Sequence, residues 1–213
     1  MNWYQYDANF SIDLMMSFVD GIEKQAAESV ANYRTKRSED RHQGLDESSW
    51  DLKEIFEEYF PSLQRRSAFL TVWGFLEHQL DQLCLLYQSE RKLRLSFTDL
   101  NGKGVDRSTG YLEKVVGLQG LKASAEWGRL KSLQNVRNVV AHNDGKIRDH
   151  QGKPKTGIVA DMKKLDFLTG EDEIVVAEGF LSQVTQACDS YFTLIEKAIY
   201  AEQGFTPPAY KRR

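Results

Sequence analysis

Apolar residues recur at intervals of three and four along most of the chain, and this is the period of an amphipathic α-helix. The clearest example lies at about 62–90, where large apolar side chains form a continuous seam. The seam residues are Phe69, Trp73, Leu76, Leu80, Leu83 and Tyr87. A seam with alternating spacings of four and three is suited to packing against another helix. The pattern therefore predicts a long helix that is buried along one face.

The same period predicts shorter helical segments elsewhere in the chain. These lie at about 11–36, 50–60, 111–118, 124–143 and 179–202. Ser11 is expected to cap the first of them, Ser108 or Thr109 the third and Ser124 the fourth, because their side-chain oxygens can accept backbone N–H bonds. Pro61 marks either the end of the 50–60 helix or the start of the next one.

Polar and turn-rich segments separate these helices. Residues 37–49 and 91–108 are expected to be loops, because they are charged or rich in glycine and other turn-forming residues. Residues 146–177 contain three short apolar runs that are typical of strands, at Ile158–Val159, Leu165–Leu168 and Glu173–Ala177. Because the last two runs flank the turn sequence Thr169-Gly170-Glu171-Asp172, we expect a small β-hairpin there.

Together these elements predict an all-α fold, an antiparallel helical bundle of four to five main helices with a small β-hairpin insertion. We expect a single domain that spans residues 1–213. Its helical core would comprise about 11–145 and 179–202, with the hairpin insertion at about 146–177 and a frayed tail at 203–213.

The composition fits a globular protein and excludes several classes. Of the 213 residues, 41% are hydrophobic and 28% are charged, and the formal net charge is −3. No apolar run approaches the roughly 18 residues that a membrane-spanning helix needs, and the N-terminal residues lack the pattern of a secretory signal. Cys84 and Cys188 lie in apolar helical patterns, which predicts two buried thiols rather than a disulfide or a zinc site. We therefore expect a cytoplasmic protein that needs no metal or cofactor.

The segment 133–145 carries the most informative chemistry in the sequence. Arg137, Asn138 and His142 interrupt a run of apolar residues just before the helix stops at Asn143-Asp144-Gly145. The stop is expected to leave His142 at an exposed helix end rather than in the core. Asn138 and His142 are four residues apart and share a helix face, while Arg137 is offset from His142 by roughly 140°. One helix thus offers one guanidinium and one imidazole, and two copies around a two-fold axis would combine two of each.

The run Arg137-Asn138-Val139-Val140-Ala141-His142 resembles the signature of the HEPN superfamily, in which an arginine followed by a polar residue precedes a histidine. The segment LTVWGFLEHQLDQL also resembles that family's second helix, where an acidic residue, here Glu77, interrupts an aromatic and leucine-rich face. At the level of helix order the resemblance covers about residues 11–202. It implies a metal-independent endoribonuclease, often a toxin or an antiviral effector, that acts as a homodimer with a composite active site.

The side chains of the motif suit that chemistry. RNA carries its own nucleophile, the 2′-hydroxyl, so His142 could act as general base or acid while Arg137 holds the phosphate oxygens. Asn138 would fix the imidazole or bind RNA. Glu77 would orient Arg137 or His142, or would be an ordinary solvated carboxylate. The product would be a 2′,3′-cyclic phosphate, and DNA would not be cleaved.

Local charge around the motif favours contact with RNA, although the bulk charge argues mildly against a general nucleic-acid binder. Residues 121–155 contain eight basic and three acidic side chains, a local charge of +5, whereas residues 39–58 carry −6. This segregation is what an RNA-contacting face requires. The candidate RNA-binding residues in the basic stretch are Lys131, Asn143, Lys146 and Arg148.

Other interpretations of these features remain open. An arginine and a histidine at a helix end often interact only with the helix dipole and the last carbonyls. The chain would then be a non-catalytic HEPN-like helical binding or dimerisation module, with the Phe69–Tyr87 seam as its contact surface, in a defence or toxin–antitoxin complex. An antitoxin or another defence protein would fit either function as a partner.

Overall fold

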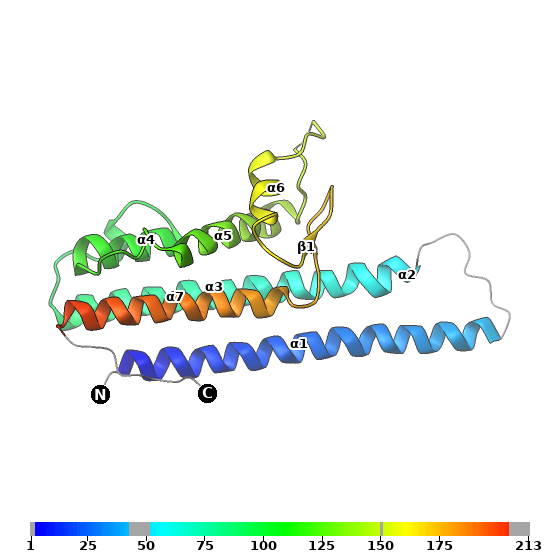
Figure 1. Cartoon of the computed structure of the whole chain (residues 1–213), viewed down its shortest axis with the longest axis horizontal. Helices are drawn as coiled ribbons and strands as arrows, with labels where there is room; N and C mark the ends of the chain where they lie inside the picture. The colour runs from blue at the N-terminus through cyan, green and yellow to red at the C-terminus, as the bar shows by residue number, and fades with distance from the viewer. Residues whose placement is uncertain (1–2, 43–51, 150, 205–213) are drawn as a thin grey trace. The chain divides into compact units, whose positions relative to one another are not determined.

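The computed structural model describes residues 3–42, 52–149 and 151–204, most of which are helical (Figure 1). The helices are α1 (Trp3–His42), α2 (Leu52–Glu54), α3 (Phe60–Glu90), α4 (Gly104–Tyr111), α5 (Ala125–Asn143), α6 (Thr156–Met162) and α7 (Phe180–Glu202). The strands β1 (Leu168–Thr169) and β2 (Val175–Val176) form an antiparallel hairpin in which Leu168 pairs with Val176. The all-α class with a small β-hairpin is thereby confirmed. No described helix is both long and apolar enough to cross a membrane.

The chain divides into two compact units, and four long helices contribute residues to both of them. The first unit contains residues 1–13, 72–131 and 185–213, and the second contains 14–71 and 132–184. The helices shared in this way are α1, α3, α5 and α7. The single-domain organisation expected from the sequence stays a prediction.

The core of the first unit contains most of the apolar seam of α3. Trp73, Leu76 and Leu80 are fully buried there, as the period of the sequence predicted. α7 supplies Tyr191, whose ring centroid lies 5.9 Å from that of Trp127 near the start of α5. The large aromatic and leucine side chains therefore hold α3, α5 and α7 around one interior.

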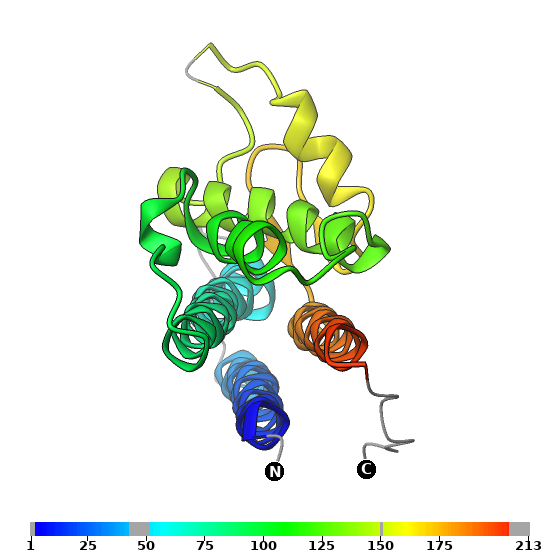
Figure 2. The same ribbon diagram turned by 90° about the vertical axis from the view of Figure 1, so that its left-hand side faces the viewer.

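The second unit combines the larger part of α1, the start of α3, the end of α5, the hairpin insertion and the start of α7. The Phe69 ring of α3 meets the Phe180 ring of α7 edge to face, with centroids 5.2 Å apart. The hairpin is tied to α3 by the Val176 N–H, which donates to Ser62 Oγ at 2.9 Å. Figure 2 shows α6 as a short helix that lies between the end of α5 and the hairpin along the chain. The insertion is thus packed onto the helices and carries its own helix.

α1 is longer than predicted at both ends. It begins at Trp3, so Ser11 lies inside the helix and is not its N-cap, and residues 37–42 are helical rather than part of a loop. Charged residues such as arginine and glutamate have good helix propensity, so a charged run on an exposed face does not end a helix. The rest of that predicted loop, 43–49, and the tail from residue 205 lie outside the described residues.

The two helices predicted on either side of Pro61 form one continuous helical path. α2 passes through a π-helical turn, Ile55–Tyr59, directly into α3. A proline has no N–H to donate, and its ring clashes with the carbonyl four residues earlier in a regular α-helix. The wider turn relieves this clash, and the Phe60 N–H bonds to the Ile55 carbonyl five residues back. Pro61 therefore lies at the start of α3 without breaking the path.

The predicted loop at 91–108 is partly helical. It contains a short 3₁₀ helix at Phe97–Asp99, and α4 then runs from Gly104 into a π-helical turn at Leu112–Val116. Ser108 and Thr109 consequently lie inside α4 and cap nothing. Their hydroxyls have tertiary partners instead, since Ser108 donates to the Asp81 carboxylate and Thr109 shares a 2.9 Å bond with the Tyr191 hydroxyl. Partners this far away along the chain cannot be predicted from the local sequence pattern.

Ile158 and Val159, predicted as a strand, belong to α6. A run of two apolar residues has no measurable period, so it cannot separate a helix from a strand. The hairpin itself is confirmed but shorter than expected, with two residues in each strand.

Candidate functional site

The helix that carries the motif, α5, begins and ends where the sequence predicted. Ser124 caps it, because its Oγ accepts the Trp127 N–H at 3.0 Å. At the other end Asp144 and Gly145 both adopt positive φ angles, of 51° and 74°. The Gly145 N–H then bonds back to the Val139 carbonyl at 3.1 Å. This geometry closes the last turn and fixes where the motif helix stops.

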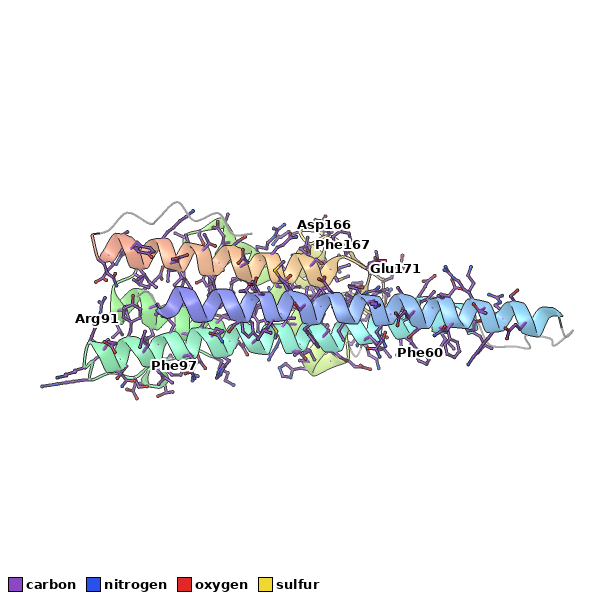
Figure 3. The ribbon with its side chains drawn as sticks, turned by 90° about the horizontal axis from the view of Figure 1, so that it is seen from below. Phe60, Arg91, Phe97, Asp166, Phe167 and Glu171 are labelled. Atoms are coloured by element: carbon purple, nitrogen blue, oxygen red, sulfur yellow. The ribbon has the colours of Figure 1, made fainter. Side chains whose placement is uncertain are left out.

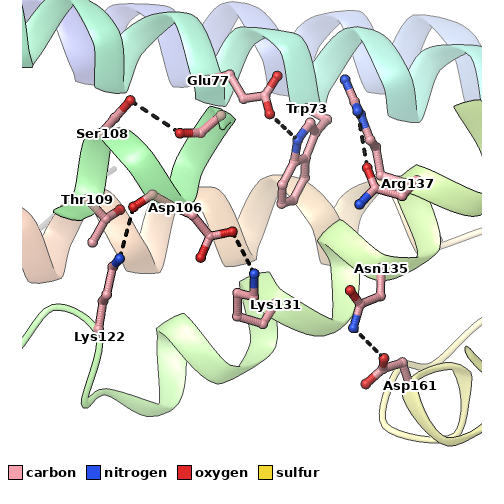
Figure 4. Close-up of polar contacts among 12 residues, drawn as sticks. Trp73, Glu77, Asp106, Ser108, Thr109, Lys122, Lys131, Asn135, Arg137 and Asp161 are labelled. Carbon is pink, nitrogen blue, oxygen red and sulfur yellow. Dashed lines mark hydrogen bonds and ion pairs between the residues drawn. The ribbon is translucent and has the colours of Figure 1, made fainter. Parts of the chain in front are cut away.

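The motif side chains are divided between a buried and an accessible face of α5. Val136 and Val140 are buried and anchor the helix, whereas Asn138 and His142 are exposed and Arg137 is half-buried. Arg137 Nη1 donates to Asn138 Oδ1 at 3.2 Å (Figure 4). His142 lies in the last turn, so its imidazole is open to a ligand. The exposed position expected for it from the helix stop is confirmed.

The corner just after α5 is held by a residue that sequence reasoning missed, Arg66 of α3. Its side chain is buried, and its Nη2 donates to Asp144 Oδ1 at 3.1 Å while its Nη1 pairs with the Glu173 carboxylate. A Cβ on Gly145 would lie 2.6 Å from Arg66 Nη2, so the guanidinium occupies the space that a side chain would fill. A cation at the C-terminal end of α5 also interacts favourably with the helix dipole.

Backbone hydrogen bonds join the hairpin insertion to the same corner. The Ile174 N–H donates to the Gly145 carbonyl at 2.9 Å, and the Ile147 N–H donates to the Asp172 carbonyl at 2.8 Å. Lys146 and Glu173 face each other in an antiparallel bridge. The chain leaving His142 is therefore fixed against the segment that leads into β2.

The insertion is also attached to α5 through a buried carboxylate on α6. Asp161 accepts hydrogen bonds from Ser132 Oγ (3.0 Å), Asn135 Nδ2 (2.6 Å) and Lys164 Nζ (3.0 Å). Burial alone would raise the pKa of Asp161, but these donors outweigh it and hold the pKa below its ordinary value. Asn135, which makes the contact with Asp161, lies two residues before Arg137 of the motif (Figure 4).

The candidate RNA-binding residues differ in how far they are already engaged. Asn143 Nδ2 donates to the Lys146 carbonyl, so its amide is already engaged by the turn that follows the helix. Arg148 pairs with Asp172 and also donates to the Gly152 carbonyl at 3.0 Å. Lys146 is exposed, and its ammonium forms no ion pair with any described residue.

Lys131 belongs to the first unit, whereas the motif lies in the second. Its Nζ pairs with Asp106 Oδ2 at 2.7 Å and lies over the Trp127 ring. Ammonium groups that are engaged in this way must exchange partners before they bind a phosphate. The assignment of all four residues to RNA binding stays a prediction.

Glu77 also belongs to the first unit, on α3. Its carboxylate accepts the indole N–H of Trp73 at 3.0 Å (Figure 4). Gly104 packs so closely against this carboxylate that a Cβ on Gly104 would collide with Glu77 Oε1. The neighbouring His78 is exposed. A role of Glu77 in orienting Arg137 or His142 stays a prediction.

The described residues contain no cluster of histidine, cysteine and acidic side chains that could hold a metal ion. Both cysteines are buried, as the sequence predicted, and burial raises the pKa of Cys84 and of Cys188 to about 12. A thiol in this state is inert as a nucleophile near neutral pH.

Compared with known protein families, with curated proteins and with solved structures, the chain shows no match.

Proposed function

We propose that this chain is a metal-independent endoribonuclease of the HEPN type, in which Arg137 and His142 act on the scissile phosphate. One observation carries the proposal: an exposed imidazole lies in the last turn of α5, on the same face as Asn138, with the guanidinium of Arg137 bonded to that asparagine. The accessible face is polar while the opposite face is anchored by buried valines. Side chains held in this way on a rigid element are suited to bind and position a ligand.

The cleavage proceeds through groups that RNA and this helix supply. A neutral imidazole of His142 takes the proton of the 2′-hydroxyl, and the 2′-oxygen attacks the adjacent phosphorus. The bond to the 5′-oxygen breaks, and a protonated imidazole gives that oxygen its proton. The products are a 2′,3′-cyclic phosphate and a free 5′-hydroxyl. Because base and acid act on opposite sides of the phosphorus, a homodimer that supplies one His142 from each copy fits the reaction best.

Arg137 stabilises the charge that builds on the phosphate oxygens. A guanidinium is planar and permanently charged, so it can bind two oxygens at once. The hydrogen bond from Arg137 Nη1 to Asn138 Oδ1 restricts the orientation of the guanidinium before the substrate binds. Lys146, exposed directly after the helix stop, would contact a neighbouring phosphate.

The test is incubation of the purified protein with single-stranded RNA in the presence of EDTA. We expect products that end in a 2′,3′-cyclic phosphate, and no cleavage of the matching DNA. Arg137→Ala and His142→Ala should each lower the rate by at least about a hundredfold without loss of folding. The matched control is His78→Ala, which removes an exposed histidine outside the motif and should leave the rate unchanged.

Intact RNA after prolonged incubation would refute the proposal, and so would cleavage that survives in the Arg137→Ala/His142→Ala double variant. A role as a toxin or an abortive-infection effector, alone or with an antitoxin or another defence protein, is part of the same proposal. It predicts that expression slows bacterial growth and that the double variant restores it. Growth that is slowed equally by both forms would exclude this role.

The alternative of a non-catalytic dimerisation module was motivated by the seam on α3. That seam, Phe69 to Tyr87, is buried within the chain and presents no open surface. A contact with another protein must therefore use a different part of the molecule.

A further inference from the structure

The short helix α6 is attached to the same face of α5 that carries the cleavage motif. Asn135, Asn138 and His142 follow one another at intervals of three and four, so they share that face. Asn135 Nδ2 donates to Asp161 Oδ2 of α6 at 2.6 Å. Asn135 precedes His142 by seven residues, which is about 10 Å along the helix axis. α6 is therefore a neighbour of the motif within the second unit.

The loop before α6 is folded back onto the chain that leaves α5. The Asp149 N–H donates to the Lys153 carbonyl at 3.0 Å, and the Lys155 N–H donates to the Ile147 carbonyl at 3.0 Å. Ile147 directly follows Lys146, the lysine after the helix stop. These backbone bonds place Lys155 beside the corner that carries Lys146.

The outer side of α6 is polar and open. The helix buries Ile158, Asp161 and Met162 and leaves a second set of residues exposed. The exposed residues are Thr156, Gly157, Ala160, Lys163 and Lys164. A Cβ added at Gly157 would meet no atom within 4 Å, so the surface there is unobstructed. Small side chains between lysines let an extended ligand approach the helix closely.

The loop and α6 carry positive charge that the fold does not neutralise. Residues 146–164 contain six basic and two acidic side chains, a net charge of +4 with histidine neutral. Asp161 is bound to α5, and Asp149 Oδ1 accepts two backbone N–H groups of its own turn at 2.8 and 3.0 Å. Lys153, Lys155 and Lys163 are exposed and form no ion pair with any described residue. Both acids are thus used to hold the fold, while these three ammonium groups are left for a ligand.

The acidic side chains of the insertion gather in its second half. Residues 165–179 contain five acids and no base, and Figure 3 labels Asp166 and Glu171 among them. Three of the five already have partners, in the pairs Asp166 with Gln183, Asp172 with Arg148 and Glu173 with Arg66. The insertion is therefore divided into a basic half with unpaired lysines and an acidic half that is mostly engaged by the fold.

We propose that the outer side of α6 and the loop before it bind the phosphate backbone of the RNA substrate through Lys153, Lys155 and Lys163. This inference rests on the proposed ribonuclease function and adds to it the surface that holds the strand beyond the scissile phosphate. An ammonium on a flexible stem binds a phosphate as a point charge and does not read the base. The surface therefore contributes affinity that is independent of sequence.

The side chains of this surface suit a strand of phosphates better than an acidic protein. Protein interfaces are centred on aromatic and other apolar anchors, and lysine is depleted in them. The exposed residues within the described part of 151–164 include no aromatic side chain and no apolar side chain larger than that of proline. A nucleic acid strand needs no such anchor, because neutralisation of its phosphates by lysine releases counterions and supplies affinity.

The first experiment measures binding in the absence of cleavage. A single-stranded 2′-O-methyl RNA oligonucleotide lacks the free 2′-hydroxyl, so it stays intact, and fluorescence anisotropy follows its binding between about 0.1 and about 1 M salt. Each contact with a single strand contributes about 0.7 to the slope of log K against log salt. The variant Lys153→Gln/Lys155→Gln/Lys163→Gln should lower that slope by about 2, a factor of about a hundred in affinity over this range of salt.

The matched control removes the same charge from the other unit. Lys92, Lys114 and Lys197 are exposed residues of the first unit. Their joint replacement by glutamine should leave the slope and the affinity unchanged. Exposed substitutions of this kind keep the fold intact, and circular dichroism verifies it for both triple variants.

The second experiment follows cleavage of an RNA of the same sequence. The lysine variant in the insertion should raise KM about as far as it weakens binding and leave kcat near the wild-type value. The reason is that the three lysines hold the strand equally in the ground state and in the transition state.

A wild-type chain that does not bind the oligonucleotide overturns the proposal, and so does a slope that the insertion variant leaves unchanged. An equal loss in the control variant overturns it too, since affinity would then depend on bulk charge. Poly-glutamate serves as the probe for an acidic protein. If it binds as tightly as the oligonucleotide, the proposal is wrong. A wild type that binds through the three lysines but leaves RNA intact supports the binding surface and refutes the proposed cleavage.

Discussion

Arg66 is the residue on which the geometry of the motif corner depends, and its replacement by methionine is the most informative single change. Arg66 retains only 5% of its side-chain exposure, and it binds Asp144 and Glu173 at once. Methionine keeps the apolar stem and removes the guanidinium. The two carboxylates then lose their partner while the packing of α3 is largely preserved.

The expected loss in the free energy of unfolding follows from the exposure of the two carboxylates that Arg66 binds. Asp144 keeps 75% of its side-chain exposure, so its contact with Arg66 is worth about 0–1 kcal/mol. Glu173 keeps 29%, and a carboxylate this enclosed is costly to leave unpaired. Breaking a buried pair costs about 3–5 kcal/mol. Because Glu173 is only partly buried, we expect Arg66→Met to lower the free energy of unfolding by about 2–3 kcal/mol.

The assay is urea unfolding of the wild type, Arg66→Met, Glu173→Gln and the double variant. At about 2–4 °C per kcal/mol for a chain of this size, the single change should also lower the melting temperature by about 4–12 °C. The double variant should lose less than Arg66→Met alone, because the unpaired charge of Glu173 is gone. Hydrogen exchange should quicken at Ile147 and Ile174, whose amides close the corner.

Two results would refute the reasoning. A loss below about 0.5 kcal/mol for Arg66→Met would place it among ordinary surface changes. Equal losses for Arg66→Met and the double variant would show that Glu173 is not left in an unfavourable state. The first result would mean that backbone bonds alone hold the corner after His142.

Three further predictions concern the same fold. Gly145→Ala should cost about 1–3 kcal/mol in urea unfolding, since its φ of 74° and the nearby Arg66 guanidinium both disfavour a Cβ, and an unchanged midpoint would contradict this. Asp161→Asn should destabilise the protein by about 1–3 kcal/mol at pH 7. Folding lowers the pKa of Asp161 from its ordinary 3.8, so its contribution is complete above pH 3.8 and is lost as the pH falls through the folded value. The gap between Asp161→Asn and wild type should therefore narrow below that pH, and a gap independent of pH would exclude the charge as the cause. A thiol reagent at pH 8 should leave Cys84 and Cys188 unmodified in the folded protein and label both in denaturant, and rapid labelling of the folded protein would contradict their burial.

Hydrophobic period and local stop signals were enough to place most of the long helices. The seam of α3 is buried as predicted, because about five turns of regular spacing determine which face of the helix is apolar. The end of α5 is also local, since glycine and aspartate at positive φ close the last turn by themselves. His142 is exposed for this reason, and the sequence alone was sufficient to place it there.

Contacts between residues far apart in the sequence determine the features that local patterns could not predict. Arg66 is separated from Asp144 by 78 residues and from Glu173 by 107, so no local pattern could identify it as the residue that holds the motif corner. The hydroxyl of Ser108 acts inside a helix because Asp81 is nearby in space, and Asp161 depends on donors contributed by α5. Phe56, Tyr59 and Phe60 before Pro61 are exposed, and they lie in or directly after a π-turn that the local sequence pattern did not predict. Local periodicity determines which face of a helix is apolar, but only packing determines which neighbour that face meets and which polar groups are enclosed with it.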